Sequence, residues 1–134
     1  MSNATGDARI LFATTNLGKL PEMQALSSKF SVTLMGLKEL STPPSFEVAE
    51  VGSSYLENAR LKVDAYRPIA GRLPVICDDS GLEVEALCGA PGIMTARYAG
   101  EKATMAENRA KLLRVMGHMM NRRALFRSLV VVKT

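Results

Sequence analysis

The feature that most constrains the fold is a short apolar run, residues 10–13 (I-L-F-A), that leads directly into a polar turn. Because no polar residue alternates with the apolar ones, the run predicts a strand that is covered on both faces. Apolar residues then recur at helical spacing, which predicts a helix that begins near Gly18. Pro21 fits only the first turn of such a helix, where backbone donors have no partner in any case. The chain therefore opens with a strand–turn–helix unit.

The same alternation of strands and helices continues along the chain. Further strands are predicted at residues 32–35, 74–77, 82–86 and 123–132, with residues 40–47 as a loop. Two capping boxes, S-x-x-E from Ser54 and T-x-x-E from Thr104, predict the starts of two more helices. The apolar faces expected for the three helices are Leu20, Met23, Leu26 and Phe30; Leu56, Ala59, Val63, Tyr66 and Ala70; and Ala106, Ala110, Leu113, Met116 and Met120. This order predicts an α/β fold, with a twisted mixed sheet flanked by helices.

Composition restricts the class of protein. With 134 residues, 47% hydrophobic and 22% charged, the chain predicts one globular domain over residues 9–134 after a flexible leader at 1–8. The net charge of +4 suits anionic ligands, but the basic residues are scattered, so we expect neither nucleic acid nor a membrane as partner. Cys77 and Cys88 stand in apolar surroundings, which favours buried, reduced thiols and a cytoplasmic location. The methionines at 105, 116, 119 and 120 are expected in the core, and His118 at a helix end.

The turn after the first strand has the parts of a phosphate site. Thr14, Thr15, Asn16, Leu17, Gly18 and Lys19 combine hydroxyls, free amides at a helix start, a glycine and a point charge. The turn lacks the G-x-x-x-x-G-K-[ST] pattern of a Walker A loop. An ordinary helix start remains the alternative.

A second polar cluster, residues 78–81 (D-D-S-G), is predicted at the end of another strand. Adjacent carboxylates repel each other, so stability does not explain Asp78 and Asp79 well. Mg²⁺ takes a few carboxylate oxygens and shares phosphate oxygens, so the two clusters together indicate a magnesium–polyphosphate site. The alternative is an exposed Asx-turn.

Residues 50–62 add a further acidic feature. Glu50 lies in the loop before the predicted helix and has no evident structural role, whereas Glu57 fits the capping box. Asn58 and Lys62 lie four residues apart on one helix face, which is also typical of a solvated face.

Four motifs in order resemble the inosine triphosphate pyrophosphatase family, which removes non-canonical purine nucleoside triphosphates. They are T-x-N-x-x-K at residues 14–19, E-x-G-x-[TS]-[FY]-x-E-N-A at 50–59, D-D-S-G-L at 78–82 and G-x-P-G-x-x-[ST]-A-R-Y at 89–98. The resemblance runs from about residue 10 to the last residue, and it implies a nucleotide cleft at the strand ends. It also implies Mg²⁺-dependent cleavage of ITP, dITP or XTP to the monophosphate and pyrophosphate, by a homodimer.

The resemblance also implies roles for individual residues. Residues 14–19, with Lys19 as a catalytic charge, would hold the triphosphate, and Asn58 and Ser80 would bind substrate. Glu50 and Asp79 would bind the metal with Asp78 beside them, and Asp79 would act as general base.

The chain departs from the family pattern in two places. Family members carry F-G-Y-D-P, lysine and S-H-R segments that read the base, and none occurs in these 134 residues, so we expect an incomplete second lobe. Thr15 stands where a glycine is usual. A weakly active or inactive module that binds nucleotide phosphates or dimerises is therefore the alternative function.

Overall fold

The computed structural model describes residues 8–134, and the predicted leader lies outside this part except for Ala8, where the first strand begins. Four strands form one sheet in the order β2-β1-β3-β4. They are β1 (Ala8–Phe12), β2 (Val32–Met35), β3 (Val75–Val84) and β4 (Ala124–Lys133). β1 pairs in parallel with β2 and β3, and β3 pairs antiparallel with β4. The predicted mixed sheet of an α/β fold is therefore confirmed.

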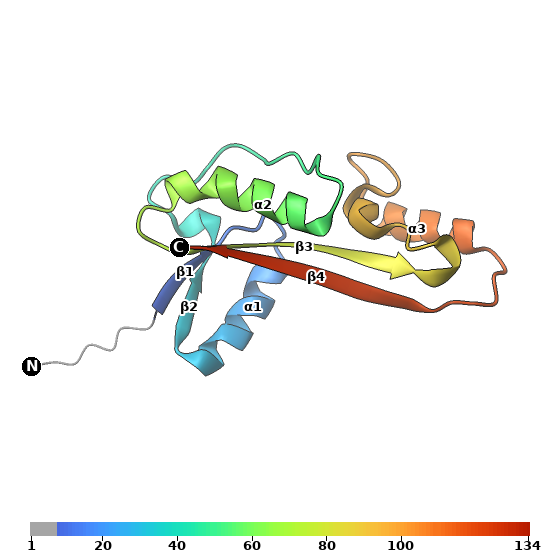
Figure 1. Cartoon of the computed structure of the whole chain (residues 1–134), viewed down its shortest axis with the longest axis horizontal. Helices are drawn as coiled ribbons and strands as arrows, with labels where there is room; N and C mark the ends of the chain where they lie inside the picture. Colours follow the sequence, from blue (N-terminus) through green and yellow to red (C-terminus); the bar gives the residue numbers. More distant parts are fainter. Residues whose placement is uncertain (1–7) are drawn as a thin grey trace, which may run out of the picture.

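Three α-helices accompany the sheet: α1 (Lys19–Ser27), α2 (Tyr55–Tyr66) and α3 (Met105–Met116). In Figure 1, α2 and α1 lie on opposite sides of the sheet, and α3 lies at the far end of the long antiparallel pair of β3 and β4. Short 3-10 segments are η1 (Ser28–Phe30), η2 (Leu37–Glu39), η3 (Arg67–Ile69), η4 (Glu85–Leu87) and η5 (Gly92–Arg97). Within residues 8–134, no helix combines the length and the apolar character that crossing a membrane requires.

Both predicted capping boxes start a helix. The Ser54 hydroxyl accepts the Glu57 amide, and the Thr104 hydroxyl accepts the Glu107 amide, each at 3.1 Å. These bonds satisfy backbone donors that the first turn of a helix leaves without partners.

One predicted boundary is wrong. β3 continues without a break from Val75 to Val84, so Asp78 and Asp79 lie inside a strand and not in a turn after it. The reason is β4, which pairs with β3 along its whole length; Asp78 lies opposite Val130 and Asp79 opposite Leu129. β1 ends earlier, at Phe12, so the two carboxylates lie just beyond the carboxyl end of this neighbouring strand.

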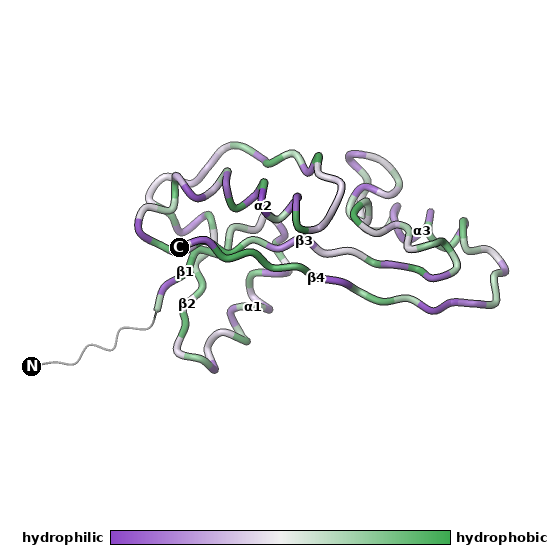
Figure 2. The backbone as a smooth tube through the Cα atoms, viewed as in Figure 1, coloured by the Kyte–Doolittle hydropathy of each residue, from purple (hydrophilic) through white to green (hydrophobic). Residues whose placement is uncertain are grey.

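The core lies where β1, β2, α2 and the start of β3 meet. It consists of Leu11, Ala13, Met35, Leu37, Val63, Tyr66, Ala70, Val75 and Cys77. The apolar face predicted for α2 is confirmed at four of its five positions, because Leu56 is exposed. In Figure 2, the tube is apolar along the C-terminal half of β4 and at the start of β3, with which it pairs.

The apolar faces predicted for the other two helices are covered only in part, since Leu20 and Met23 are half-buried but Leu26 and Phe30 are exposed. α1 buries no residue, and α3 buries only Met116, while Leu113 and Met120 are exposed. The expectation of core methionines fails for the same reason at residues 105, 119 and 120. Cys77 is buried, but Cys88 is exposed, and both thiols are free.

Candidate active site

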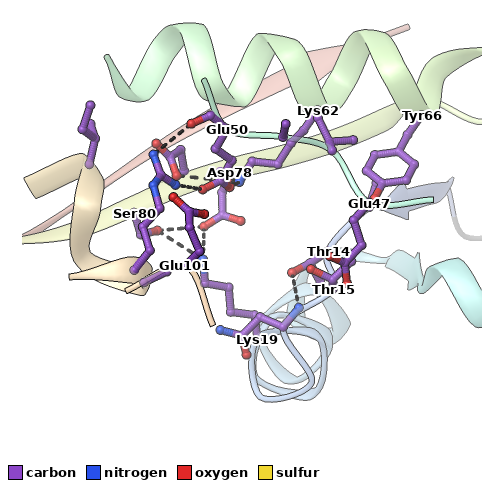
Figure 3. Close-up of a pocket in the computed structure, with 18 residues that line it drawn as sticks. Thr14, Thr15, Lys19, Glu47, Glu50, Lys62, Tyr66, Asp78, Ser80 and Glu101 are labelled. Carbon is purple, nitrogen blue, oxygen red and sulfur yellow. Dashed lines mark hydrogen bonds and ion pairs between the residues drawn. The ribbon is translucent and has the colours of Figure 1, made fainter. Parts of the chain in front are cut away.

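A cavity of about 590 Å³ opens beyond the carboxyl end of β1. Its walls come from the turn after β1, the loop before α2, one face of α2, the middle of β3 and η5. Eight of the residues predicted to form a site line it: Thr14, Thr15, Asn16, Lys19, Glu50, Asp78, Asp79 and Ser80. Leu17, Gly18 and Asn58 are not part of its wall. Side chains from three distant parts of the sequence thus meet at one edge of the sheet, as Figure 3 shows.

The turn after β1 is held by its own polar groups. The Thr14 hydroxyl accepts the Asn16 amide at 3.1 Å, and the Asn16 side chain accepts the Gly18 amide at 2.9 Å. The Lys19 amide donates to the Asn16 carbonyl at 3.2 Å. The prediction of free amides is therefore wrong for these three groups, because the turn uses them to fix its own shape. The turn lines the cavity with Thr14, Thr15, Asn16 and Lys19, and Lys19 supplies its positive charge.

Asp78 of β3 fixes the direction of the Lys19 side chain. Its ammonium lies 2.7 Å from Asp78 Oδ2, and the Ser80 hydroxyl donates to the same oxygen at 2.8 Å. Figure 3 shows Lys19 reaching from the start of α1 toward Asp78 and Ser80. The ion pair is partly buried, since the two side chains are 31% and 10% exposed. The Asp78 carboxylate is thus held by Lys19 and Ser80.

Lys62 stands between the other two carboxylates. Its ammonium lies 2.5 Å from Glu50 Oε1 and 3.7 Å from Asp79 Oδ1. It also donates to the Asp78 carbonyl at 2.7 Å. Burial alone would lower the pKa of Lys62, but the hydrogen bond and charge of Glu50 and the nearby aspartates outweigh it, and the pKa is raised. Lys62 is therefore held as an ammonium ion among three oxygens.

Asp79 is the most buried carboxylate of the site, with 5% of its surface exposed. Burial raises the pKa of Asp79, and the charge of Lys62 opposes this effect without cancelling it. The Asn58 side-chain amide donates to Asp79 Oδ2 at 3.3 Å, while its oxygen accepts the Gly52 amide at 2.8 Å. Asn58 is fully buried, so the solvated face is wrong for this residue, and its contacts are to the protein.

The carboxylate oxygens around Lys62 are of the kind that bind a divalent cation. Glu50 and Asp79 already share one positive group, and Mg²⁺ needs only one or two carboxylates when waters and phosphates supply the rest. Within residues 8–134, no cluster of three or more metal-type side chains is present, which agrees with Asp78 turning toward Lys19. Glu50 and Asp79 are the two carboxylates that would hold such an ion, and Asp78 is paired with Lys19.

Sequence reasoning missed two cationic residues of the site. Lys62 was read as half of a solvated face, although its spacing from Asn58 places both on the helix face that meets β3. Arg97, inside the fourth motif, was given no role. It donates to the Glu50 carbonyl at 2.8 Å and pairs with Glu50 Oε2 at 3.3 Å.

Fold and site together define an α/β protein with a cavity of mixed charge at a strand end, where ligands bind in such sheets. The chain belongs to the Ham1 family, whose model matches residues 10–134. It is 47% identical over 108 residues to the dITP/XTP pyrophosphatase of Vibrio cholerae, an alignment that covers 81% of this chain and 52% of that protein. The chain thus spans about half the length of this relative.

Solved structures share the fold. A HAM1 protein from Coxiella burnetii is 35% identical with a TM-score of 0.76, and the match covers 93% of this chain and 62% of that one. A nucleoside-triphosphatase / dITP/XTP pyrophosphatase from Mycobacterium abscessus is 32% identical with a TM-score of 0.65, over 93% of this chain and 69% of that one.

Proposed function

We propose that this chain forms the phosphate and metal side of a nucleoside triphosphate pyrophosphatase site. The reaction is Mg²⁺-dependent hydrolysis of ITP, dITP or XTP between the α- and β-phosphates, which yields the monophosphate and pyrophosphate. Family membership and the relatives named dITP/XTP pyrophosphatase support the substrate class. We further propose a cytoplasmic homodimer.

One observation carries the proposal: Lys19 and the carboxylates of Glu50 and Asp79 line one cavity. A polyphosphate needs positive charge along its oxygens, and a metal that binds phosphate needs carboxylates nearby. The cavity offers both at the end of β1, and no single element of the fold could supply them alone.

Each residue then has a role that its contacts support. Lys19, aimed by Asp78 and Ser80, neutralises charge that develops on the leaving pyrophosphate. Asp79, with its pKa raised by burial, accepts the proton of the attacking water on a carboxylate oxygen. Glu50 and Asp79 hold the Mg²⁺, which adds charge neutralisation when bound. Residues 14–16 form the wall next to Lys19 and contact the phosphates.

The proposal is tested by pyrophosphate release from ITP in the presence of Mg²⁺. Asp79→Asn keeps the size of the side chain but removes the base and a metal ligand, so turnover should fall at least about a hundredfold, the usual contribution of a general base. Arg60→Met, on the exposed side of α2, is the matched control and should leave turnover unchanged. Wild-type turnover in a correctly folded Asp79→Asn variant would exclude Asp79 as the base.

Titration with ITP, XTP, ATP and GTP separates the enzyme from the alternative binding module. The side chains assigned above address phosphate and metal, so we expect similar, weak affinities for the four nucleotides. A strong preference for ITP or XTP would show that these 134 residues read the base. Binding of all four without pyrophosphate release would support the binding module.

A further inference from the structure

Glu50 lies on a loop that the sheet does not hold. The loop runs from the end of η2 to the start of α2, and residues 41–54 contain no helix or strand. A carboxylate on such a loop can bind a metal tightly only if other groups fix its position, because a mobile ligand loses conformational entropy on binding.

Side chains from neighbouring elements provide this fixation. Asn58 accepts the Gly52 amide and Glu57 accepts the Ser53 amide, both at 2.8 Å, at the end of the loop next to α2. Arg97 reaches Glu50 itself from η5. It donates one guanidinium nitrogen to the Glu50 carbonyl at 2.8 Å and places another 3.3 Å from the carboxylate.

Arg97 is itself held on two sides. The Thr95 hydroxyl accepts the Leu82 amide of β3 at 2.9 Å, which fixes η5 to the strand that carries Asp79. Asn108 of α3 donates to the Ala96 carbonyl at 2.9 Å. Gly81 allows the close approach, since a Cβ at this position would overlap the Gly92 carbonyl. The Arg97 side chain is only 15% exposed.

The contacts divide the Glu50 carboxylate between two cations. Arg97 contacts Oε2 and the backbone carbonyl of Glu50. The other carboxylate oxygen, Oε1, contacts Lys62, whose ammonium also lies near Asp79. The two-point contact to carbonyl and carboxylate sets the direction of the side chain. Lysine is a single point charge and cannot reproduce that fork.

We propose that Arg97 is a positioning residue that fixes Glu50 for divalent-cation binding together with Asp79. This inference rests on the proposed metal site, but it assigns a residue that the proposed reaction does not use. Arg97 lines the same cavity, and in this role it acts through Glu50.

The test measures Mn²⁺ affinity of the 134-residue chain without nucleotide, by the loss of the EPR signal of free Mn²⁺. Arg97→Lys keeps the charge, so a purely electrostatic role predicts unchanged affinity. The proposal predicts about tenfold weaker binding, which corresponds to the loss of one charge-assisted hydrogen bond. Arg60→Met is the control and should bind Mn²⁺ as the wild type does.

A second variant covers the case in which Arg97→Lys is poorly folded. Arg97→Gln removes the positive charge, so electrostatics alone predicts tighter Mn²⁺ binding, whereas the proposal predicts weaker binding than in the wild type. In both variants, the Mg²⁺ concentration for half-maximal turnover should rise while kcat at saturating Mg²⁺ stays near the wild-type value.

The outcomes separate the two proposals. Mn²⁺ binding by the wild type that Arg97→Lys leaves unchanged overturns the role of Arg97 and leaves the metal site intact. A wild type that binds no Mn²⁺ and whose turnover does not depend on Mg²⁺ overturns the metal site and the role of Arg97 together, whatever the variants do.

Discussion

Two halves of the molecule differ in how they bury apolar surface. The packed half consists of β1, β2, α2 and residues 75–77 of β3, and it supplies the core cluster described above. The extended half consists of residues 81–84 of β3, η5, α3 and residues 124–127 of β4, whereas the C-terminal part of β4 pairs with residues 75–77 of β3 in the packed half. In the extended half, Val84 and Met116 are buried, but Leu113 is 66% and Phe126 is 80% exposed. Figure 1 shows these segments of β3 and β4 leading away from the packed half, with α3 at their far end.

The difference matters because the candidate site lies at the boundary. Asp78 and Asp79 follow directly on the buried residues of β3, and Lys62 comes from α2, so the packed half positions all three. Arg97 comes from the extended half and contacts Glu50. Asp78, Asp79 and Lys62 are thus supported by the core cluster. Arg97 lies on η5, an element with few buried contacts.

The largest difference should come from leucine truncations in the two halves. Leu11→Ala removes a fully buried side chain of β1 and should cost about 2–5 kcal/mol in the free energy of unfolding. Leu113→Ala on α3 should change it by no more than about 0.5 kcal/mol, because the side chain is mostly exposed. Urea denaturation followed by circular dichroism measures both. Equal losses would show that Leu113 is covered in solution and that the two halves are equally packed.

Substitution of the two free cysteines gives a second comparison between a buried and an exposed position. The Cys77 thiol is buried and donates to the Ala13 carbonyl at 3.6 Å, and burial raises its pKa to about 12. Cys77→Ser puts a hydroxyl into this apolar place and should cost about 1–3 kcal/mol. Cys88→Ser, at an exposed position, should cost less than about 0.5 kcal/mol.

Alkylation at neutral pH checks the same contrast without mutation. Thiolate is the reactive form, so Cys77 should stay unmodified in the native protein and react only after unfolding. Cys88 should react in the native state. Modification of Cys77 at the same rate as Cys88 would mean that the packed half opens readily.

Helix caps should produce a smaller difference. Ser54 caps α2, which buries four residues, so Ser54→Ala should lower the free energy of unfolding by about 1 kcal/mol. Thr104 caps α3, which buries only Met116. Thr104→Ala should therefore raise amide exchange in the first turn of α3 and change global stability by less than about 0.5 kcal/mol. A global loss as large as that of Ser54→Ala would show that α3 unfolds together with the core.

The sequence was sufficient for the elements of the fold but not for their packing. Capping boxes and apolar runs depend on neighbouring residues, so Ser54, Thr104 and β2 were predicted correctly. The apolar face of α3 has the right period, yet burial requires an opposing surface, and the described residues place none against Leu113. The length of β3 depends on β4, which lies far along the chain, so local residues could not reveal it.

The site shows the same limit. Motif spacing predicted which residues gather, and the cavity brings Lys19, Glu50 and Asp79 together. Which carboxylate faces which cation is a matter of side-chain direction, and spacing does not determine that Asp78 turns to Lys19. Arg97 was missed because its partner, Glu50, is forty-seven residues away.

The smallest expected effect concerns Glu83, which forms a surface ion pair within the extended half and also accepts a hydrogen bond from α2. Glu83 of the extended half accepts from Arg127 at 2.7 Å and from the Tyr55 hydroxyl of α2 at 3.0 Å. The hydrogen bond from Arg127 lowers the pKa of Glu83 below its ordinary value. A lowered pKa in the folded state adds stability above the unfolded pKa, about 4.3, and this contribution is lost as the pH falls through the folded pKa.

NMR titration of the Glu83 carboxyl carbon measures this pKa directly. Arg127→Met should raise it toward the ordinary value, while the melting temperature at neutral pH should hardly change, because an exposed pair contributes little to stability. Lys133→Met, which removes the exposed pair with Asp64, is the control and should leave the Glu83 titration where it was. If Glu83 already titrates at its ordinary value in the wild type, neither Arg127 nor the Tyr55 hydroxyl holds it in solution. The extended half would then be joined to α2 more loosely than the contact between Tyr55 and Glu83 indicates, and the contrast between the two halves would be larger than the structure shows.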